Sequence, residues 1–161
     1  ARGRVSTGSM ALELGLVDEL GTLEDAIAHA MKLADLESVK KVERLILPDE
    51  PAPMRPRIIA LANLEEVDAI LLTGGTGISQ RDQTYETIAG ILTKQLPGYG
   101  ELFRWLSYQE IGSATILSRT IGGLLGTTVV LTMPGSPKAV KLAVEKIILP
   151  ELPHLVREAR R

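Results

Sequence analysis

The chain has 161 residues, and 18 lysines and arginines against 20 aspartates and glutamates give it a formal net charge of −2. This near-balance gives no electrostatic reason to expect binding to nucleic acid or to an anionic membrane. The absence of cysteine excludes disulfides, thiolate metal sites and a cysteine nucleophile. The chain has only two histidines, His29 and His154, so we do not expect a histidine-based metal site.

The length suits one domain with a sizeable core. Since 45% of the residues are hydrophobic but only 3% are aromatic, that core must be built from aliphatic side chains. The sequence contains no run of about 18 uninterrupted apolar residues, which argues against a membrane span. The first residues also lack the apolar run of a signal peptide. We therefore expect a single cytoplasmic α/β domain over residues 1–161.

The hydrophobic pattern predicts alternating helices and strands. Helices are expected at residues 10–14, 23–36, 54–64, 84–96, 101–108, 113–120, 138–149 and from 152 to the basic tail, and strands at 16–20, 39–47, 67–72 and 127–133. Gly122, Gly123 and Gly126 predict a turn, and Pro150 is expected to end a helix. Such alternation predicts a three-layer α/β/α sandwich with a mostly parallel sheet.

The most informative segment is the glycine-rich stretch at residues 73–82, Thr-Gly-Gly-Thr-Gly-Ile-Ser-Gln-Arg-Asp. It follows an apolar run and leads into a helical pattern, so backbone N–H groups and a helix end could receive a phosphate there. Asp82 would then hold a metal or order a nucleophile. The alternative is a tight strand-to-helix turn in which Asp82 caps the helix. The spacing matches neither a Walker A loop nor a dinucleotide-binding loop.

Three other positions follow strands or flank glycine turns. Asp49 could share Mg²⁺ with Asp82, or it could be an ordinary turn aspartate. Ser136 could offer a second anion-binding helix end, or it could simply cap its helix. Arg119 could hold a phosphate or carboxylate, or it could lie on the surface. Because ligands of α/β folds bind beyond the carboxyl ends of strands, we expect the site at that edge.

Four of the five aromatic residues lie between Tyr99 and Tyr108. In a chain with so few aromatic residues, this clustering predicts a contact surface between subunits. The alternative is a local patch of the core.

From about residue 42 to 156 the chain resembles the MoaB/MogA family of molybdenum-cofactor biosynthesis proteins. The resemblance rests on several ordered motifs: residues 47–50 (Leu-Pro-Asp-Glu), 73–77 with Arg81-Asp82, 96–101 (Leu-Pro-Gly-Tyr-Gly-Glu), 116–119 (Ile-Leu-Ser-Arg), 133–137 (Met-Pro-Gly-Ser-Pro) and 149–153 (Leu-Pro-Glu-Leu-Pro). It implies a molybdopterin-binding-domain-like α/β/α fold that is commonly trimeric or hexameric.

The resemblance also implies a reaction, the transfer of AMP from Mg-ATP to the terminal phosphate of molybdopterin. The implied catalytic and Mg²⁺-binding pair is Asp49 and Asp82. The implied substrate- and phosphate-binding residues are Thr73, Gly74, Gly75, Thr76, Gly77, Ser79, Ser118, Pro134, Gly135, Ser136 and Lys138. Positioning two phosphates and neutralising their charge needs no covalent nucleophile, which suits a chain without cysteine.

The N-terminal segment departs from that family. Residues 3–36 instead resemble the C-terminal part of the SppA signal peptide peptidase, through residues 3–8, 11–21 and 23–27, which lie outside the Ser/Lys dyad of that protease. We therefore hypothesise a recombined chain, in which a head at residues 1–38 replaces the usual first strand and helix of a body at 39–161. Adenylyl transfer is then expected to be impaired. The alternatives are a chimeric scaffold without activity and, less favoured, a peptidase remnant that binds peptide or membrane partners.

Overall fold

The structure is a computed structural model that describes residues 43–48 and 50–161. The chain divides into two units, with the boundary between Arg44 and Leu45, and almost all of the described residues belong to the second. The elements expected before residue 39, the segment similar to SppA and Asp49 lie outside the described residues. The division into a head at 1–38 and a body at 39–161 stays a prediction.

The described strands form one four-stranded sheet in the order β1-β4-β3-β2. Its strands are β1 (Ala69–Thr73), β2 (Lys94–Gln95), β3 (Gly122–Leu125) and β4 (Thr128–Met133). β1 and β4 run parallel, and Ala69 is paired with Val129 and Thr73 with Met133. β3 is antiparallel to both β4 and β2. The described sheet is therefore mixed, whereas the sequence predicted a mostly parallel one.

The antiparallel part arises from a hairpin, where the sequence predicts only a turn. Gly126 has a φ of 63°, a left-handed conformation that suits glycine and turns the chain tightly between β3 and β4. Glycine is needed at position 123 of β3 because the strand passes close to β2. A Cβ at this position would lie 2.2 Å from the carbonyl oxygen of Lys94. Two glycines without β propensity thus form a strand through close backbone packing.

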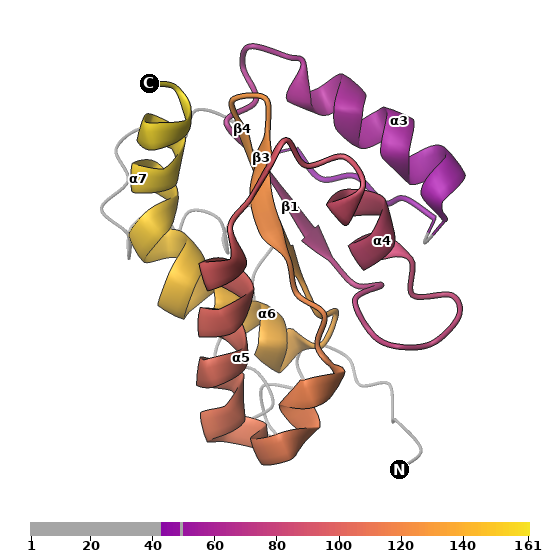
Figure 1. The fold of residues 1–161 in the computed structure, drawn as a ribbon, viewed down its shortest axis with the longest axis vertical. Coiled ribbons are helices and arrows are strands. Elements are labelled where there is room, and N and C mark those ends of the chain that lie inside the picture. The colour runs from indigo at the N-terminus through magenta and orange to yellow at the C-terminus, as the bar shows by residue number, and fades with distance from the viewer. Residues whose placement is uncertain (1–42, 49) are drawn as a thin grey trace, which may run out of the picture. The chain divides into compact units, whose positions relative to one another are not determined.

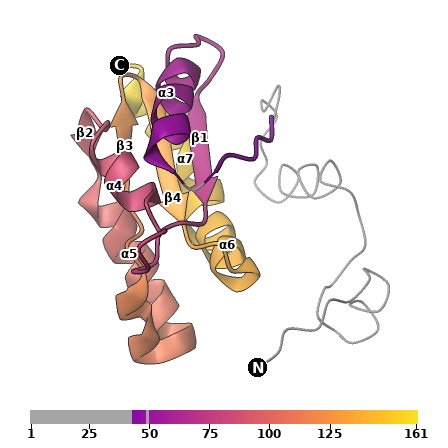
Figure 2. The same cartoon turned by 90° about the vertical axis from the view of Figure 1, so that its right-hand side faces the viewer.

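Helices cover both faces of the sheet, as Figures 1 and 2 show. On one side lie α3 (Pro51–Ala62) and α4 (Thr84–Ala89), and on the other lie α5 (Pro97–Ile111), α6 (Pro137–Ala143) and α7 (Leu149–Ala159). A 3₁₀ turn, η1 (Gly112–Leu117), follows α5, and a π-helical turn, η2 (Val144–Ile148), joins α6 to α7. The described part of the chain is therefore a three-layer α/β/α fold, which confirms the expected fold class.

The central strand β4 supplies both core layers, because its side chains alternate between the two faces. Val129, Leu131 and Met133 pack with α5, α6 and η2, and Val130 packs with α3 and α4. All six residues of β4 are buried. The mainly aliphatic composition therefore forms two core layers around one buried strand, with Tyr99 and Phe103 as the buried aromatic residues of one layer.

Several expected elements differ in extent. Residues 43–48 form no regular element, and no described strand pairs with residues 43–47, so that part of the strand expected at 39–47 is wrong. The helix expected at 84–96 ends at Ala89, because Gly90 caps it and Thr93 then pairs with Leu124. The helix expected at 113–120 is the 3₁₀ turn η1.

Pro150 was expected to end the helix predicted at residues 138–149, but it does not interrupt the helical path. It lies in the first turn of α7, directly after η2. In a π turn the regular i→i−4 ladder is already interrupted, so the missing N–H of proline costs little at that point. The helical path therefore continues to Ala159.

Tyr99 offers a test of the core beneath α5. Its hydroxyl donates a 2.9 Å hydrogen bond to the carbonyl oxygen of Thr132, and burial raises the pKa of the phenol above its ordinary value of 10. Tyr99→Phe should lower the free energy of unfolding by about 1 kcal/mol and remove a tyrosine of raised pKa from a spectrophotometric titration. Tyr108→Phe, at a 57% exposed position, is the control. Equal stability of both variants would contradict the prediction.

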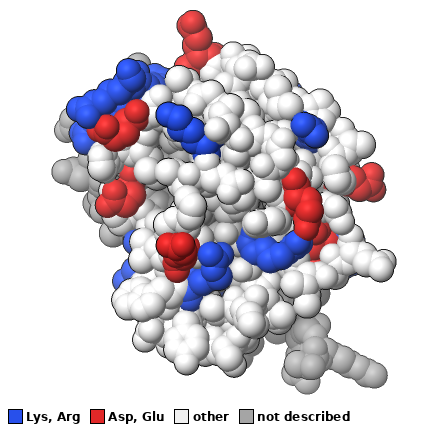
Figure 3. All heavy atoms as spheres, in the orientation of Figure 1, with Lys and Arg blue, Asp and Glu red and all other residues white. Residues whose placement is uncertain are grey.

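Charged residues are interspersed on the face shown in Figure 3, where blue and red side chains are separated by wide uncharged areas. Among the described helices, none combines the length and hydropathy needed to cross a membrane.

Candidate functional site

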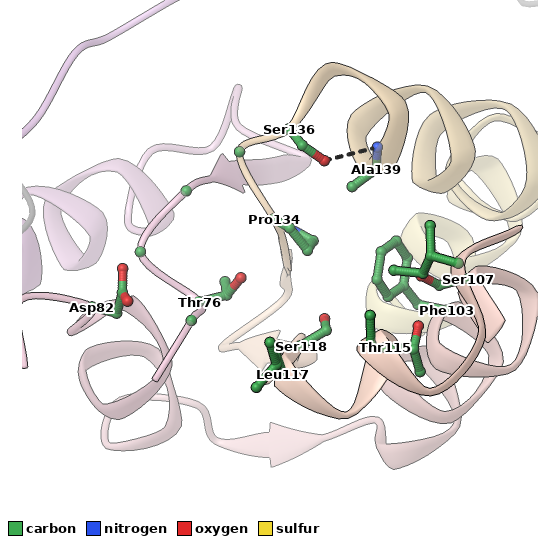
Figure 4. Close-up of a pocket in the computed structure, with 16 residues that line it drawn as sticks. Thr76, Asp82, Phe103, Ser107, Thr115, Leu117, Ser118, Pro134, Ser136 and Ala139 are labelled. Atoms are coloured by element: carbon green, nitrogen blue, oxygen red, sulfur yellow. Dashed lines mark hydrogen bonds between the residues drawn. The ribbon is translucent and has the colours of Figure 1, made fainter. Parts of the chain in front are cut away.

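A pocket of about 360 Å³ lies where the chain leaves the carboxyl ends of the parallel strands β1 and β4 (Figure 4). The glycine loop, the loop after β4, and parts of α5, η1 and α6 line it: Gly74, Gly75, Thr76, Gly77, Asp82, Phe103, Ser107, Ile111, Ala114, Thr115, Leu117, Ser118, Pro134, Gly135, Ser136 and Ala139. The pocket therefore occupies the sheet edge at which the sequence predicted a ligand site.

The glycine loop is held against the loop that follows β4. Gly74 and Gly75 have φ values of 99° and 61°, which other residues rarely adopt. The N–H of Gly74 donates to the carbonyl oxygen of Met133 at 3.0 Å, and a Cβ on Gly135 would lie 3.4 Å from the Cα of Gly74. Glycine is therefore needed at positions 74 and 75 for their backbone conformation, while Gly135 packs closely against Gly74.

Asp82 closes a tight turn at one end of the glycine loop. Its Oδ2 accepts a 2.9 Å hydrogen bond from the N–H of Ser79, and its own N–H donates to the carbonyl oxygen of Ser79 at 2.9 Å. Asp82 does not cap α4, since Gln83 occupies the N-cap without a side-chain bond. A Cβ on Gly77 would lie 2.8 Å from Asp82 Oδ2, so glycine there leaves room for the carboxylate.

Two serines line the pocket from other elements. The Oγ of Ser118 lies 2.7 Å from the Oγ1 of Thr120. The Oγ of Ser136 accepts a 3.3 Å hydrogen bond from the N–H of Ala139, so Ser136 caps α6 with Pro137 in its first turn. The expected N-cap is confirmed, and the same residue also lies at the pocket.

Arg119 binds backbone carbonyls of the glycine loop but does not line the pocket. Its Nε donates to the carbonyl oxygen of Gly77 at 2.7 Å and its Nη2 to that of Asp82 at 2.9 Å. Its Nη1 is paired with Glu86, and this hydrogen bond lowers the pKa of that carboxyl below its ordinary value of 4.5. The guanidinium is therefore neither free on the surface nor among the groups that line the pocket.

The structure brings together nine of the residues that the sequence analysis proposed: Gly74, Gly75, Thr76, Gly77, Asp82, Ser118, Pro134, Gly135 and Ser136. Thr73, Ser79 and Lys138 do not line the pocket. Thr73 instead donates to the carbonyl oxygen of Pro134 at 3.3 Å, and Lys138 is exposed in the first turn of α6. Asp49, the proposed partner of Asp82, lies outside the described residues.

Sequence reasoning missed the apolar wall of the pocket. Phe103, Ile111, Ala114 and Leu117 supply its apolar side chains, and Figure 4 shows Phe103, with the polar Ser107 and Thr115, on the side opposite Asp82 and Thr76. The available signal was the aromatic cluster, which the structure divides: Tyr99 and Phe103 are buried in the core, while Trp105 and Tyr108 are 61% and 57% exposed. The residues follow helical spacing, so α5 turns two of them inward and two outward.

Thr115 has a buried hydroxyl that finds no hydrogen-bond partner among the described residues, although it lies at the pocket. Thr115→Val should therefore raise the free energy of unfolding by about 1 kcal/mol, because it removes a buried group that is not satisfied. Thr132→Val is the matched control, since its buried Oγ1 bonds both the N–H and the carbonyl oxygen of Ile121. Urea unfolding should show a higher free energy of unfolding for Thr115→Val and a lower one for Thr132→Val. A lower free energy of unfolding in both variants would contradict the prediction.

The donors around the pocket suit a hard cation shared with phosphate oxygens. In the described ranges no three histidine, aspartate or glutamate side chains gather closely enough to form a metal site by themselves. Asp82 supplies one carboxylate to the lining, and Thr76, Ser118 and Ser136 supply hydroxyls. Mg²⁺ is commonly bound by one or two carboxylates together with substrate phosphates, so this donor set fits a magnesium–nucleotide complex.

The comparison with known proteins decides the family. A family model described as "Probable molybdopterin binding domain" matches residues 5–154. This chain belongs to that family. Molybdenum cofactor biosynthesis protein B of Bacillus subtilis (strain 168) is 50% identical over 117 residues, which cover 72% of this chain and 69% of the relative. The same protein of Bacillus cereus is 47% identical with the same coverage.

Solved structures of this family share the fold. A crystal structure of molybdenum cofactor biosynthesis protein B matches with a TM-score of 0.75 and 42% identity, over 89% of this chain and 91% of that one. The tungsten cofactor synthesizing protein MoaB from Pyrococcus furiosus matches with a TM-score of 0.69 and 36% identity, over 85% and 84%. The resemblance to the MoaB/MogA family is thereby confirmed. The SppA resemblance and a recombined origin stay hypotheses.

Proposed function

We propose that this chain binds molybdopterin and transfers AMP to it from Mg-ATP. One observation supports this most: the glycine loop, Asp82, Ser118 and the loop around Ser136 meet in one pocket beyond two parallel strands. The matched family model is named for molybdopterin binding, and the relatives are named for molybdenum cofactor biosynthesis. The transfer step itself comes from the MoaB/MogA resemblance.

In the proposed reaction, an oxygen of the terminal phosphate of molybdopterin attacks the α-phosphorus of ATP. A new phosphorus–oxygen bond forms, the bond to the β-phosphate oxygen breaks, and pyrophosphate leaves with that electron pair. No side chain is covalently changed. The chain's contribution is to hold the two reacting groups in line and to stabilise their charge.

Each described element of the pocket has a role in this proposal. The backbone N–H groups of the glycine loop and the hydroxyls of Ser118 and Ser136 would bind phosphate oxygens. Asp82, with Asp49 as its proposed partner, would hold Mg²⁺, and the ion would neutralise phosphate charge when bound. The apolar wall around Phe103 would receive a flat heterocycle. Burial of the heterocycle against this wall would exclude water from that side of the pocket.

We also propose that copies of this chain associate as a trimer or hexamer through the outer face of α5 and η1. Large apolar side chains are exposed there: Leu102, Trp105, Tyr108, Ile111, Ile116 and Leu117. Such clusters commonly mark protein contacts. Sedimentation should show one oligomeric species, and Trp105→Glu should dissociate it; a monomeric wild-type protein would contradict this part of the proposal. A cytoplasmic location belongs to the same proposal.

The 161-residue chain can test the proposed function directly. Isothermal titration with AMP and with ATP, each with Mg²⁺ or with a chelator, should show binding that Mg²⁺ strengthens for ATP. A turnover assay with molybdopterin and Mg-ATP should then release pyrophosphate and form adenylylated molybdopterin. A protein that is folded by circular dichroism but binds neither molybdopterin nor a nucleotide would overturn the proposal. Binding without turnover would favour the impaired activity expected for a recombined chain.

A further inference from the structure

Arg119 contacts the glycine loop without lining the pocket. Both its backbone N–H and its guanidinium group take part in these contacts. Besides the bonds of Nε to Gly77 and Nη2 to Asp82, its own N–H donates to the carbonyl oxygen of Thr76 at 3.1 Å. Its Cζ lies 5.3 Å from the centre of the Tyr85 ring, a distance that suits a cation–π contact. The side chain is 27% exposed.

The two carbonyls that the guanidinium group of Arg119 binds lie at the ends of the loop segment 77–82. A guanidinium is planar and rigid, so it fixes the positions of both acceptors relative to each other. Between them, the mutual bonds of Ser79 and Asp82 complete the turn. The guanidinium thus determines how closely the main chain of Asp82 approaches Gly77, and with it the place of the carboxylate beside the glycine loop.

The partners on α4 hold the guanidinium in this orientation. Glu86 neutralises its charge, and the Tyr85 ring supports its face. Its donors point to the loop carbonyls and to α4, and Arg119 is not among the residues that line the pocket. Arg119 is therefore placed to act on a bound anion through the loop and not by touching it.

We infer that Arg119 is a positioning residue: it holds the Gly77–Asp82 segment so that the Asp82 carboxylate faces the site where Mg²⁺ and a phosphate would bind. The effect on ligand binding rests on the proposed function, but the effect on the loop does not. Lysine cannot substitute, because a single ammonium group cannot bind both carbonyls with the geometry of a planar fork.

The Arg119→Lys and Arg119→Ala variants of the 161-residue chain provide the test, and the corresponding variants Arg160→Lys and Arg160→Ala are the matched controls. Arg160 also binds a backbone carbonyl and a carboxylate, those of Glu65 and Asp68, but it lies away from the pocket. The first readout is hydrogen exchange at the N–H groups of Ser79, Asp82 and Thr84, which bond within the loop. The second is titration with Mg-ATP.

Both Arg119 variants should exchange these loop amides about 10- to 100-fold faster, as expected for losing hydrogen bonds to a charged group. The amides of β4 should change less. Mg-ATP affinity should fall by a similar factor. Added guanidinium ion, well below denaturing concentrations, should restore both readouts in Arg119→Ala, because it can occupy the space that the side chain leaves. The Arg160 variants should leave the loop unchanged.

Unchanged loop exchange in Arg119→Lys would overturn the inference, and so would uniform acceleration of the loop and β4 without rescue by guanidinium. If Arg119→Ala does not fold, Glu86→Gln, which removes the negative charge that pairs with the guanidinium, should still speed exchange at Asp82. If the wild-type protein binds no nucleotide, the proposed function fails, while the exchange at Ser79 and Asp82 still decides the role of Arg119.

Discussion

Asp82→Asn is expected to weaken Mg-ATP binding by about 10- to 100-fold, a loss typical of removing an interaction with a charged group. Binding in the presence of a chelator should change much less. Among the described residues, Asp82 supplies the one acidic side chain that lines the pocket. Asparagine keeps an oxygen that can accept the hydrogen bond from Ser79, so the turn at residues 79–82 should survive. Isothermal titration with and without Mg²⁺ measures both quantities.

The matched control for this variant is Asp68→Asn. Asp68 is an exposed aspartate whose carboxylate pairs with Arg160, and it does not line the pocket. It should leave the affinity for Mg-ATP unchanged. If Asp82→Asn retains the full Mg²⁺ dependence of the wild-type protein, the carboxylate does not hold the ion and its proposed role must be abandoned.

Phe103→Ala is expected to lower the free energy of unfolding by about 3–5 kcal/mol, the usual cost of deleting a buried aromatic side chain. Phe103 is 1% exposed and belongs to the core layer formed with β4, α6 and η2. It also lines the pocket, so the same substitution enlarges the cavity on its apolar side. Urea unfolding followed by circular dichroism measures the loss.

Trp105→Ala separates this effect from the general cost of removing an aromatic residue from α5. Trp105 is two positions further along the same helix and is 61% exposed. In the dissociated protein its truncation should change stability by less than about 1 kcal/mol. Comparable losses in the two variants would mean that α5 is not oriented as described.

The sequence predicted the parts of the fold and site that depend on local patterns. The apolar run ending at Leu72 and the β-rich run at residues 127–133 correspond to β1 and β4, whose carboxyl ends carry the pocket. The glycine loop was also found from the sequence, because left-handed backbone and close approach both require glycine. These features follow from a few neighbouring residues, so one sequence is enough.

Other features depend on partners that are distant in the chain. Gly122 and Gly123 form a strand only because β2 and β4 lie on either side of them. The role of Arg119 depends on carbonyls more than 35 residues earlier, with sequence separations of 42 and 37 for Gly77 and Asp82. Thr115 and Phe103 look like ordinary helical residues in the sequence. Tertiary packing alone brings them to the pocket.

The π-helical turn at Val144–Ile148 has a consequence for the C-terminal helix. Because its hydrogen bonds span five residues, this turn accommodates one residue more than an α turn would. Each residue advances an α-helix by about 100° around its axis, so the extra residue sets the rotational phase of α7. That phase directs Leu152, Leu155, Val156 and Ala159 toward the core. Deleting a single residue from the turn would rotate this stripe toward solvent, so insertions and deletions should be tolerated less here than in the loops.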